Sequence, residues 1–153
     1  MNAPYKIFFE KTYPVSKQVL WEKWTDSTQL KSFFGMENKI EANVGGAFEI
    51  YFLLDAPEGF RGSEGCKFLE LSPFEKIRFS WNTPPNFEEI RKEGPNSEVM
   101  IELEALENNQ TKLKLTHSKW PNDPKYIPIV EYFEKAWEYV LNNLSKTIES
   151  ERK

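Results

Sequence analysis

Cysteine and histidine are scarce in this sequence, which has one of each among 153 residues. A single cysteine, Cys66, excludes an internal disulfide framework. One histidine, His117, distant in the chain from that cysteine, gives no cluster of metal ligands, so we predict no metal site and no cofactor. No apolar run approaches the ~20 residues that a membrane span needs, and the N-terminus lacks the apolar core of a signal peptide. A cytoplasmic protein is therefore the default expectation.

Positive charge is also in short supply, because 20 Lys and Arg residues face 24 Asp and Glu residues, for a net charge of −4. This balance argues against non-specific binding to nucleic acid or to an anionic membrane. The length fits one domain over residues 1–153, without internal repeats or linkers. Aromatic residues reach 15%, which is high, with 12 Phe and 5 Trp. Such rings either fill a wide core or line a cavity.

The last stretch, from Tyr126 to Lys153, has the periodicity of one long amphipathic helix. Pro128 suits its first turn, where the missing N–H is not needed. A helix of this length is a rod on the order of 30 Å long, which needs a large apolar surface to lie against. The apolar stripe comprises Val130, Phe133, Trp137, Val140, Leu141, Leu144 and Ile148.

Most of the remaining chain alternates apolar and polar residues and predicts strands joined by short turns, an antiparallel meander. Residues 5–12 form the first strand. Pro14 then opens a helix ending near Thr25, and a second short helix over 27–33 begins at the capping pair Asp26 and Gln29. The further expected strands are 36–42, 47–54, 66–71, 76–81, 99–105 and 113–117.

Two connecting segments have properties of their own. Gly45 and Gly46 fit a tight turn or bulge where side chains would clash. Residues 82–96 form the longest loop, with four Pro or Gly residues and a charged middle. Loops of this length are often functional or mobile, so we expect this one to act as a lid if the sheet and helix enclose a pocket.

Several local phrases, in this order and spacing, resemble a known superfamily. They are VLW at 19–21, WTD at 24–26, VGGAF at 44–48, GCKFLELSP at 65–73, IRFSW at 77–81, TKLKLTH at 111–117 and AW at 136–137. Together they resemble the SRPBCC (START-like, helix-grip) superfamily, in particular proteins similar to the activator of the ninety-kilodalton heat-shock-protein ATPase. The resemblance implies an α+β helix-grip fold: a curved antiparallel sheet of about six or seven strands around the C-terminal helix, with two short helices after the first strand.

The sequence departs from this pattern in two places. Phe33 and Phe34 stand where such proteins often have a tryptophan, an exchange that keeps an aromatic ring. Ala136 stands where they often have a glycine, and we expect its methyl group to narrow the cavity slightly.

The aromatic residues give the strongest indication of function. In the fold that the resemblance implies, the space between sheet and helix is often an open pocket, apolar with few polar groups, which suits a small hydrophobic or aromatic ligand. Tyr51, Tyr132 and His117 could orient such a ligand through hydrogen bonds. The expected lining residues of the cavity are Phe48, Phe52, Phe79, Trp81, His117, Phe133 and Trp137.

Three polar side chains are candidates for chemistry. Alternation puts His117 on the inner face, as a hydrogen-bonded core residue or as an acid–base group near neutral pH. Cys66 would need a thiolate-stabilising neighbour to act as a nucleophile, so an inert thiol is the better interpretation. Glu70 shares a face with Cys66 and Phe68, so it is either a cavity acid or, as we prefer, a surface charge.

Three hypotheses about function follow. The first is non-catalytic binding of a small hydrophobic ligand between sheet and helix. The second is a co-chaperone-like or regulatory module that binds a chaperone or another protein through the outer sheet or the loop tips. The third is a cyclase-like or hydrolase-like enzyme that uses His117 with a carboxylate.

Overall fold

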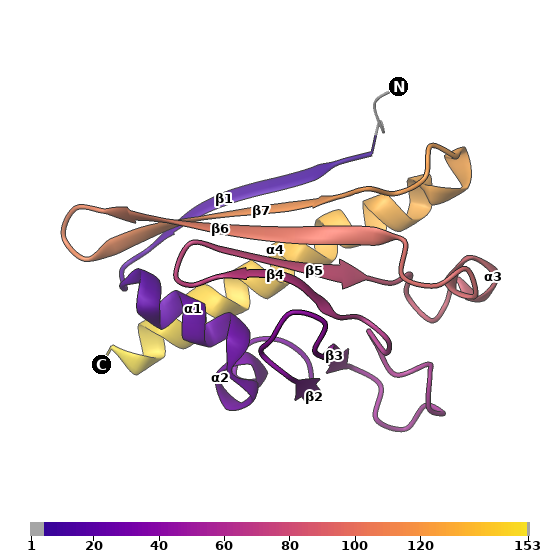
Figure 1. Ribbon diagram of the computed structural model, residues 1–153, viewed down its shortest axis with the longest axis horizontal. Coiled ribbons are helices and arrows are strands. Elements are labelled where there is room, and N and C mark those ends of the chain that lie inside the picture. The colour runs from indigo at the N-terminus through magenta and orange to yellow at the C-terminus, as the bar shows by residue number, and fades with distance from the viewer. Residues whose placement is uncertain (1–4, 153) are drawn as a thin grey trace.

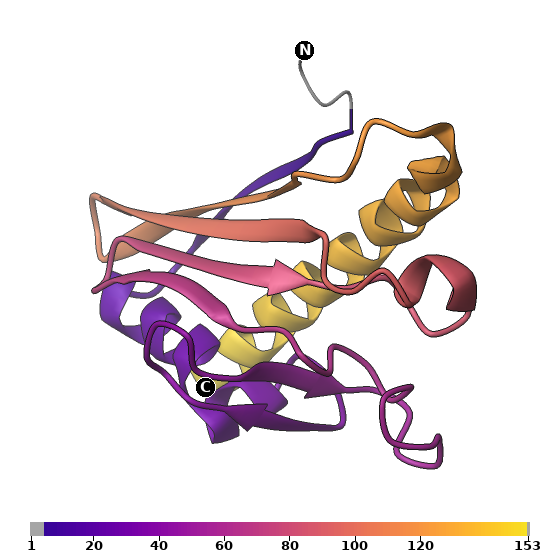
Figure 2. The ribbon, with the colours of Figure 1, turned by 45° about the vertical axis from the view of Figure 1, so that its right-hand side comes forward.

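The computed structural model describes residues 5–152 and has the predicted α+β helix-grip architecture. Five antiparallel strands form the main sheet in the order β1-β7-β6-β5-β4, and the long helix α4 crosses one face of it (Figures 1 and 2). A smaller two-stranded sheet, β2-β3, adjoins the β4 edge. In chain order the elements are β1 (Ile7–Tyr13), α1 (Lys17–Thr25), α2 (Ser27–Lys31), β2 (Glu37–Ile40), β3 (Phe48–Tyr51), β4 (Phe68–Ser72), β5 (Lys76–Trp81), α3 (Glu88–Arg91), β6 (Ser97–Leu106), β7 (Gln110–Ser118), η1 (Pro124–Tyr126) and α4 (Ile127–Glu151).

Helix α4 presents the predicted apolar stripe to the sheet. Pro128 lies in its first turn, as expected, after the short 3-10 helix η1. Ile129 is fully buried, whereas Val130, which the spacing had placed on the stripe, is only partly buried. In the first turn the buried position is therefore one residue earlier than predicted. From Phe133 to Ile148 the buried residues are those of the predicted stripe.

The two short helices are capped by the side chains that precede them. The hydroxyl of Ser16 accepts a hydrogen bond from the N–H of Val19, and Asp26 accepts one from the N–H of Gln29, so the predicted capping pair is confirmed. Lys23 of α1 is buried, and its ammonium group lies 2.6 Å from a carboxylate oxygen of Glu151. This contact ties α1 to the end of α4, beside which both short helices lie in Figure 1.

The strands number seven, as predicted, but they are divided between two sheets. Backbone hydrogen bonds from the N–H of Phe48 to the oxygen of Cys66, and from the N–H of Phe68 to the oxygen of Gly46, join β3 to β4 only locally. Gly46 cannot carry a side chain, because a Cβ atom there would lie 2.2 Å from the oxygen of Glu41. The glycine pair therefore lies in the turn between β2 and β3, where the missing side chains let β4 approach the backbone closely.

Strand β3 ends earlier than predicted. The N–H groups of Phe52 and Leu53 both bond to the oxygen of Arg61, which turns the chain out of the sheet after Tyr51. Leu54, the last residue of the predicted strand, is therefore outside β3 and is 49% exposed.

The outer face of the main sheet is covered by paired charges. Lys76, Glu102, Lys114 and Glu10 stand opposite one another on four neighbouring strands and alternate in sign. Opposite charges on facing strands attract one another, so this row stabilises the sheet where it faces solvent.

Glu70 lies on this outer face. A β-bulge between Phe68 and Glu70 shifts the register, so Glu70 no longer shares the inward face of Cys66 and Phe68. Its carboxylate accepts a hydrogen bond from Arg78, which holds the pKa of Glu70 below its usual value. The surface interpretation is the one that the structure supports.

The loop over residues 82–96 is more ordered than its composition indicates, because it contains the one-turn helix α3. Within residues 5–152, no helix is long and apolar enough to cross a membrane.

Candidate functional site

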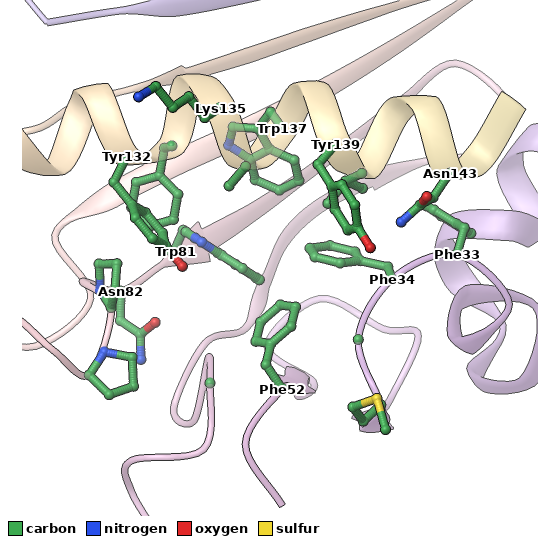
Figure 3. Close-up of a pocket in the computed structure, with 18 of the residues that line it drawn as sticks. Phe33, Phe34, Phe52, Trp81, Asn82, Tyr132, Lys135, Trp137, Tyr139 and Asn143 are labelled. Atoms are coloured by element: carbon green, nitrogen blue, oxygen red, sulfur yellow. The ribbon is translucent and has the colours of Figure 1, made fainter.

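A groove of about 1080 Å³ runs beside α4, between that helix, the segment after α2 and the start of the 82–96 loop (Figure 3). Its volume is slightly above the ~300–1,000 Å³ that is typical of small-molecule sites. Aromatic side chains from four parts of the chain form its interior: Phe34, Phe52, Trp81, Phe133 and Trp137.

These rings support one another. The ring of Phe34 lies 5.7 Å from Phe52, 5.8 Å from Trp81 and 5.5 Å from Trp137, measured between centroids. Trp81 and Trp137 are 5.7 Å apart. Aromatic pairs at these separations attract one another beyond their burial, so the wall of the groove is preformed without a ligand.

Four of the seven predicted lining residues border the groove, namely Phe52, Trp81, Phe133 and Trp137. Phe48 and Phe79 do not, because their rings stack at 4.0 Å in the closed part of the core, fully buried. His117 also lies outside the lining, on the inner face of β7. Alternation along a strand predicts which side chains face inward, but it cannot tell a filled interior from an open one.

Three residues that were not expected in the lining, Phe33, Phe34 and Met36, border the groove from the segment after α2. The sequence contained an indication of this, because Phe33 and Phe34 follow a short helix at a position where similar proteins often have a tryptophan. Ala136 borders the groove as well, and its methyl group therefore occupies space that a glycine would leave free.

Two tyrosines on α4, Tyr132 and Tyr139, stand at the rim and are 46% and 69% exposed. Tyr132 packs edge-on against Phe87 of the 82–96 loop at 6.5 Å, so this loop closes one end of the groove. Tyr51, the other tyrosine expected to orient a ligand, instead donates its hydroxyl hydrogen to Glu49 and does not border the groove.

His117 is fully buried behind this lining and is held on both sides. Its Nδ1 accepts a 2.9 Å hydrogen bond from the indole N–H of Trp137, and its Nε2 lies 2.8 Å from the hydroxyl oxygen of Ser97. That hydroxyl donates to the backbone oxygen of Trp81, so it must accept from Nε2. His117 is therefore the neutral tautomer with its proton on Nε2.

The environment of His117 opposes an acid–base role. Burial lowers the pKa of the imidazole well below its ordinary value. Each ring nitrogen already has a partner, and no carboxylate bonds to either one within the described residues. The network instead fixes the indole of Trp137 and the backbone of Trp81, both of which border the groove.

Cys66 is fully buried, and burial raises the pKa of its thiol to about 12. A thiol in this state is almost entirely protonated near neutral pH, and the thiolate is the nucleophilic form. The structure thus supports the inert interpretation. Among residues 5–152 there is also no group of three His, Cys, Asp or Glu side chains that could hold a metal ion.

A buried arginine, Arg91 of α3, connects the 82–96 loop to the loop over residues 52–65 at the end of the groove near α3. The guanidinium group of Arg91 donates hydrogen bonds to the backbone oxygens of Gly59, Gly62 and Thr83, and it lies 3.1 Å from a carboxylate oxygen of Glu64. Gly62 borders the groove, so this arginine fixes part of its wall.

Comparison with protein families gives a match over residues 14–149, to the family described as "Activator of Hsp90 ATPase homolog 1-like protein". The chain belongs to this family. The match covers all the residues that form the groove. It also confirms the resemblance drawn from the sequence phrases, and it supports a ligand-binding or co-chaperone-like module.

Solved structures show the same fold. PFC0360w, an HSP90 activator from Plasmodium falciparum, is 23% identical with a TM-score of 0.71, and the alignment covers 95% of this chain and 96% of that one. The Aha1 dimer from Colwellia psychrerythraea is 19% identical with a TM-score of 0.69, covering 94% and 96%. Protein MLL2253 from Mesorhizobium loti is 17% identical with a TM-score of 0.76, covering 95% and 97%. No curated protein sequence matches the chain.

Proposed function

We propose that this protein binds a small hydrophobic or aromatic molecule, without catalysis, in the groove beside α4. The observation that carries the proposal is the open, preformed groove, whose interior is built from five aromatic rings rather than from polar groups. A filled core would leave no such space, because protein interiors are packed as densely as organic crystals. A cytoplasmic location stays a prediction from the sequence.

The proposal favours binding over catalysis because the interior offers no reactive pair. The histidine that the enzyme hypothesis requires lies outside the groove, neutral and hydrogen-bonded on both sides. A rigid aromatic wall lowers the entropy cost of binding, since the rings are already ordered in the free protein.

Native mass spectrometry of protein purified from its own cells, followed by a thermal-shift screen with fatty acids, sterol-like compounds and polyketide-like aromatics, tests this function. A co-purified molecule, or a melting temperature that rises with ligand concentration, supports binding. The variant Ala136→Trp places a large ring inside the groove, and we expect it to lose the shift. Glu138→Trp adds the same ring at an exposed position of α4 outside the groove, and this variant should still show the ligand-induced rise in melting temperature. A clean apo mass with no shift for any compound would overturn the proposal.

A second function, binding to a chaperone, is favoured by family membership and by exposed apolar side chains on the 52–65 loop. Leu53, Leu54 and Phe60 are 52%, 49% and 37% exposed. The outer sheet suits an apolar partner less well, because its charges are already paired across the strands. A pull-down with purified Hsp90 tests this candidate: Leu53→Ser with Leu54→Ser should release the chaperone, and equal capture of the double variant would count against the loop.

A further inference from the structure

The groove is long. It follows α4 from Pro128 to Thr147, and at about 1.5 Å per residue this stretch of helix is roughly 30 Å long. Its aromatic interior lies in the middle, along Phe133 and Trp137. A site that follows one helix for about five turns fits an elongated molecule better than a compact one.

The end beside α3 is apolar. Pro84, Pro85 and Phe87 of the loop face Tyr132 of α4 across it. Glu131 borders the groove at this end, and among the described residues its carboxylate has no ion pair, so it disfavours an anion there.

The end beside α2 carries hydrogen-bond donors. Asn143 and Lys146 border it from neighbouring turns of α4, on the same side of the helix. Neither side chain has a hydrogen bond or an ion pair within the part of the chain that the structure describes. Lys31 also borders this end, but its ammonium group is already 3.1 Å from Glu37.

One more lysine, Lys135, borders the groove near its middle, but Figure 3 shows its side chain extending away from the cavity. The amide of Asn143 lies on the cavity side of α4 in the same view. The available positive charge is thus concentrated where the groove meets α2.

We propose that the ligand is a long-chain amphiphile with an anionic head group, such as a fatty acid, bound in one orientation. The head group accepts hydrogen bonds from the amide of Asn143 and the ammonium group of Lys146. The hydrocarbon chain runs along Trp137 and Phe133 and ends against Phe87. This inference rests on the proposed function, because it names the ligand class of the same groove.

Binding of hexadecanoic acid and of 1-hexadecanol, measured by tryptophan fluorescence titration below their micelle-forming concentrations, tests the charge preference. Since a charge-assisted hydrogen bond at a partly exposed site is lost, we expect Lys146→Gln to weaken binding of the acid roughly threefold to tenfold. Binding of the alcohol should not change. Lys39→Gln removes the same charge from an exposed position of β2 that does not border the groove, and it should leave both affinities unchanged.

The orientation has its own test. A stearic acid with a nitroxide label near the carboxylate should broaden the NMR signals of the backbone amides around Asn143 and Lys146. A label near the methyl end should broaden those around Phe87 and Tyr132. The reverse pattern, or broadening of both sets by either label, would overturn the orientation.

The outcomes separate the two proposals. Equal affinity for the acid and the alcohol, both insensitive to Lys146→Gln, would overturn the anionic amphiphile but leave a hydrophobic ligand in the groove. No binding of either compound, with no shift in the wider thermal screen, would overturn the proposed function itself. If the acid binds more tightly than the alcohol, and its affinity falls in Lys146→Gln but not in the control variant, the result supports both the proposed function and the anionic amphiphile.

Discussion

The indole N–H of Trp137, on α4, donates a 2.9 Å hydrogen bond to Nδ1 of His117, on β7. This bond joins the long helix to the sheet at the level of the groove, and both side chains are buried. From His117 the network continues through Ser97 to the backbone of Trp81. The two tryptophans that line the groove are therefore positioned by one histidine that does not itself reach it.

Replacing Trp137 separates its packing from its hydrogen bond. Because the side chain is 2% exposed, we expect Trp137→Ala to lower the free energy of unfolding by roughly 3–5 kcal/mol. Trp137→Phe keeps a ring but leaves Nδ1 of His117 unpaired, which should cost about 1–3 kcal/mol.

Urea denaturation measures both losses, with Tyr139→Ala as the control at a 69% exposed position of the same helix. That change should stay within about 0.5 kcal/mol. A loss well below 3 kcal/mol for Trp137→Ala would mean that the ring contributes little packing beyond the face that borders the groove.

Stability should fall as the pH drops below about 6.5, because His117 is buried and neutral. Its pKa is lower in the folded chain than in the unfolded one, so below about 6.5 the unfolded chain binds more protons. Stability is then lost by up to about 1.4 kcal/mol per pH unit until the folded pKa is reached. The groups packed on the imidazole are uncharged: Ser97, Trp120, Phe133 and Trp137.

Urea midpoints between pH 7.5 and pH 5 check this prediction. Carboxylates with lowered pKa, such as Glu64 and Glu70, contribute stability that is lost only at more acidic pH, so they do not mask the effect. The variant His117→Gln has no imidazole to protonate and should show a flatter dependence over this range. The same slope in both proteins would assign the effect to other groups.

The architecture could be predicted from the sequence because it depends on periodicity. The stripe that includes Phe133 and Trp137 and the alternating strands each give a local signal that the tertiary structure obeys. The openness of the interior could not be predicted. Phe79 and Trp81 alternate identically on β5, yet only Trp81 borders the groove, because the course of α4 and the segment at 33–36 decide which rings are covered.

Two further details depend on local features that the sequence does not reveal. The face of Glu70 depended on a β-bulge, which adds one residue to a strand without a distinctive sequence. Arg91 bonds to backbone oxygens, including that of Gly62 in a distant loop. A pattern of side chains in the sequence does not show which backbone oxygens will lie near an arginine.

Cys66 should be unreactive in the folded protein. Its side chain is fully buried and its thiol pKa is raised to about 12, so iodoacetamide at pH 8 meets little thiolate and no open path. In the variant Ser150→Cys, which adds an exposed cysteine near the end of α4, mass spectrometry should find one adduct in the native protein and two in urea. Labelling of Cys66 at the rate of the added cysteine would show that the core around it opens readily.

Arg91 should control the rigidity of the closed end of the groove. Its guanidinium group is buried and bonds to carbonyl oxygens in two loops, so Arg91→Met removes the donor of those oxygens, while Glu64 keeps its bonds from backbone N–H groups. We expect a loss of roughly 3 kcal/mol or more in the free energy of unfolding, and faster amide hydrogen exchange over 59–64 and 82–87. Arg91→Lys should recover only part of the loss, because one ammonium group cannot reproduce the planar fork.

Lys92→Met is the matched control, since Lys92 is an exposed neighbour whose partner is Glu89. An exposed pair of this kind contributes at most about 1 kcal/mol, so exchange in both loops should stay unchanged. Because Gly62 and Phe87 border the groove, Arg91→Met should also weaken any ligand that binds there. Unchanged exchange and unchanged affinity would show that the two loops hold their positions through packing alone, without the arginine.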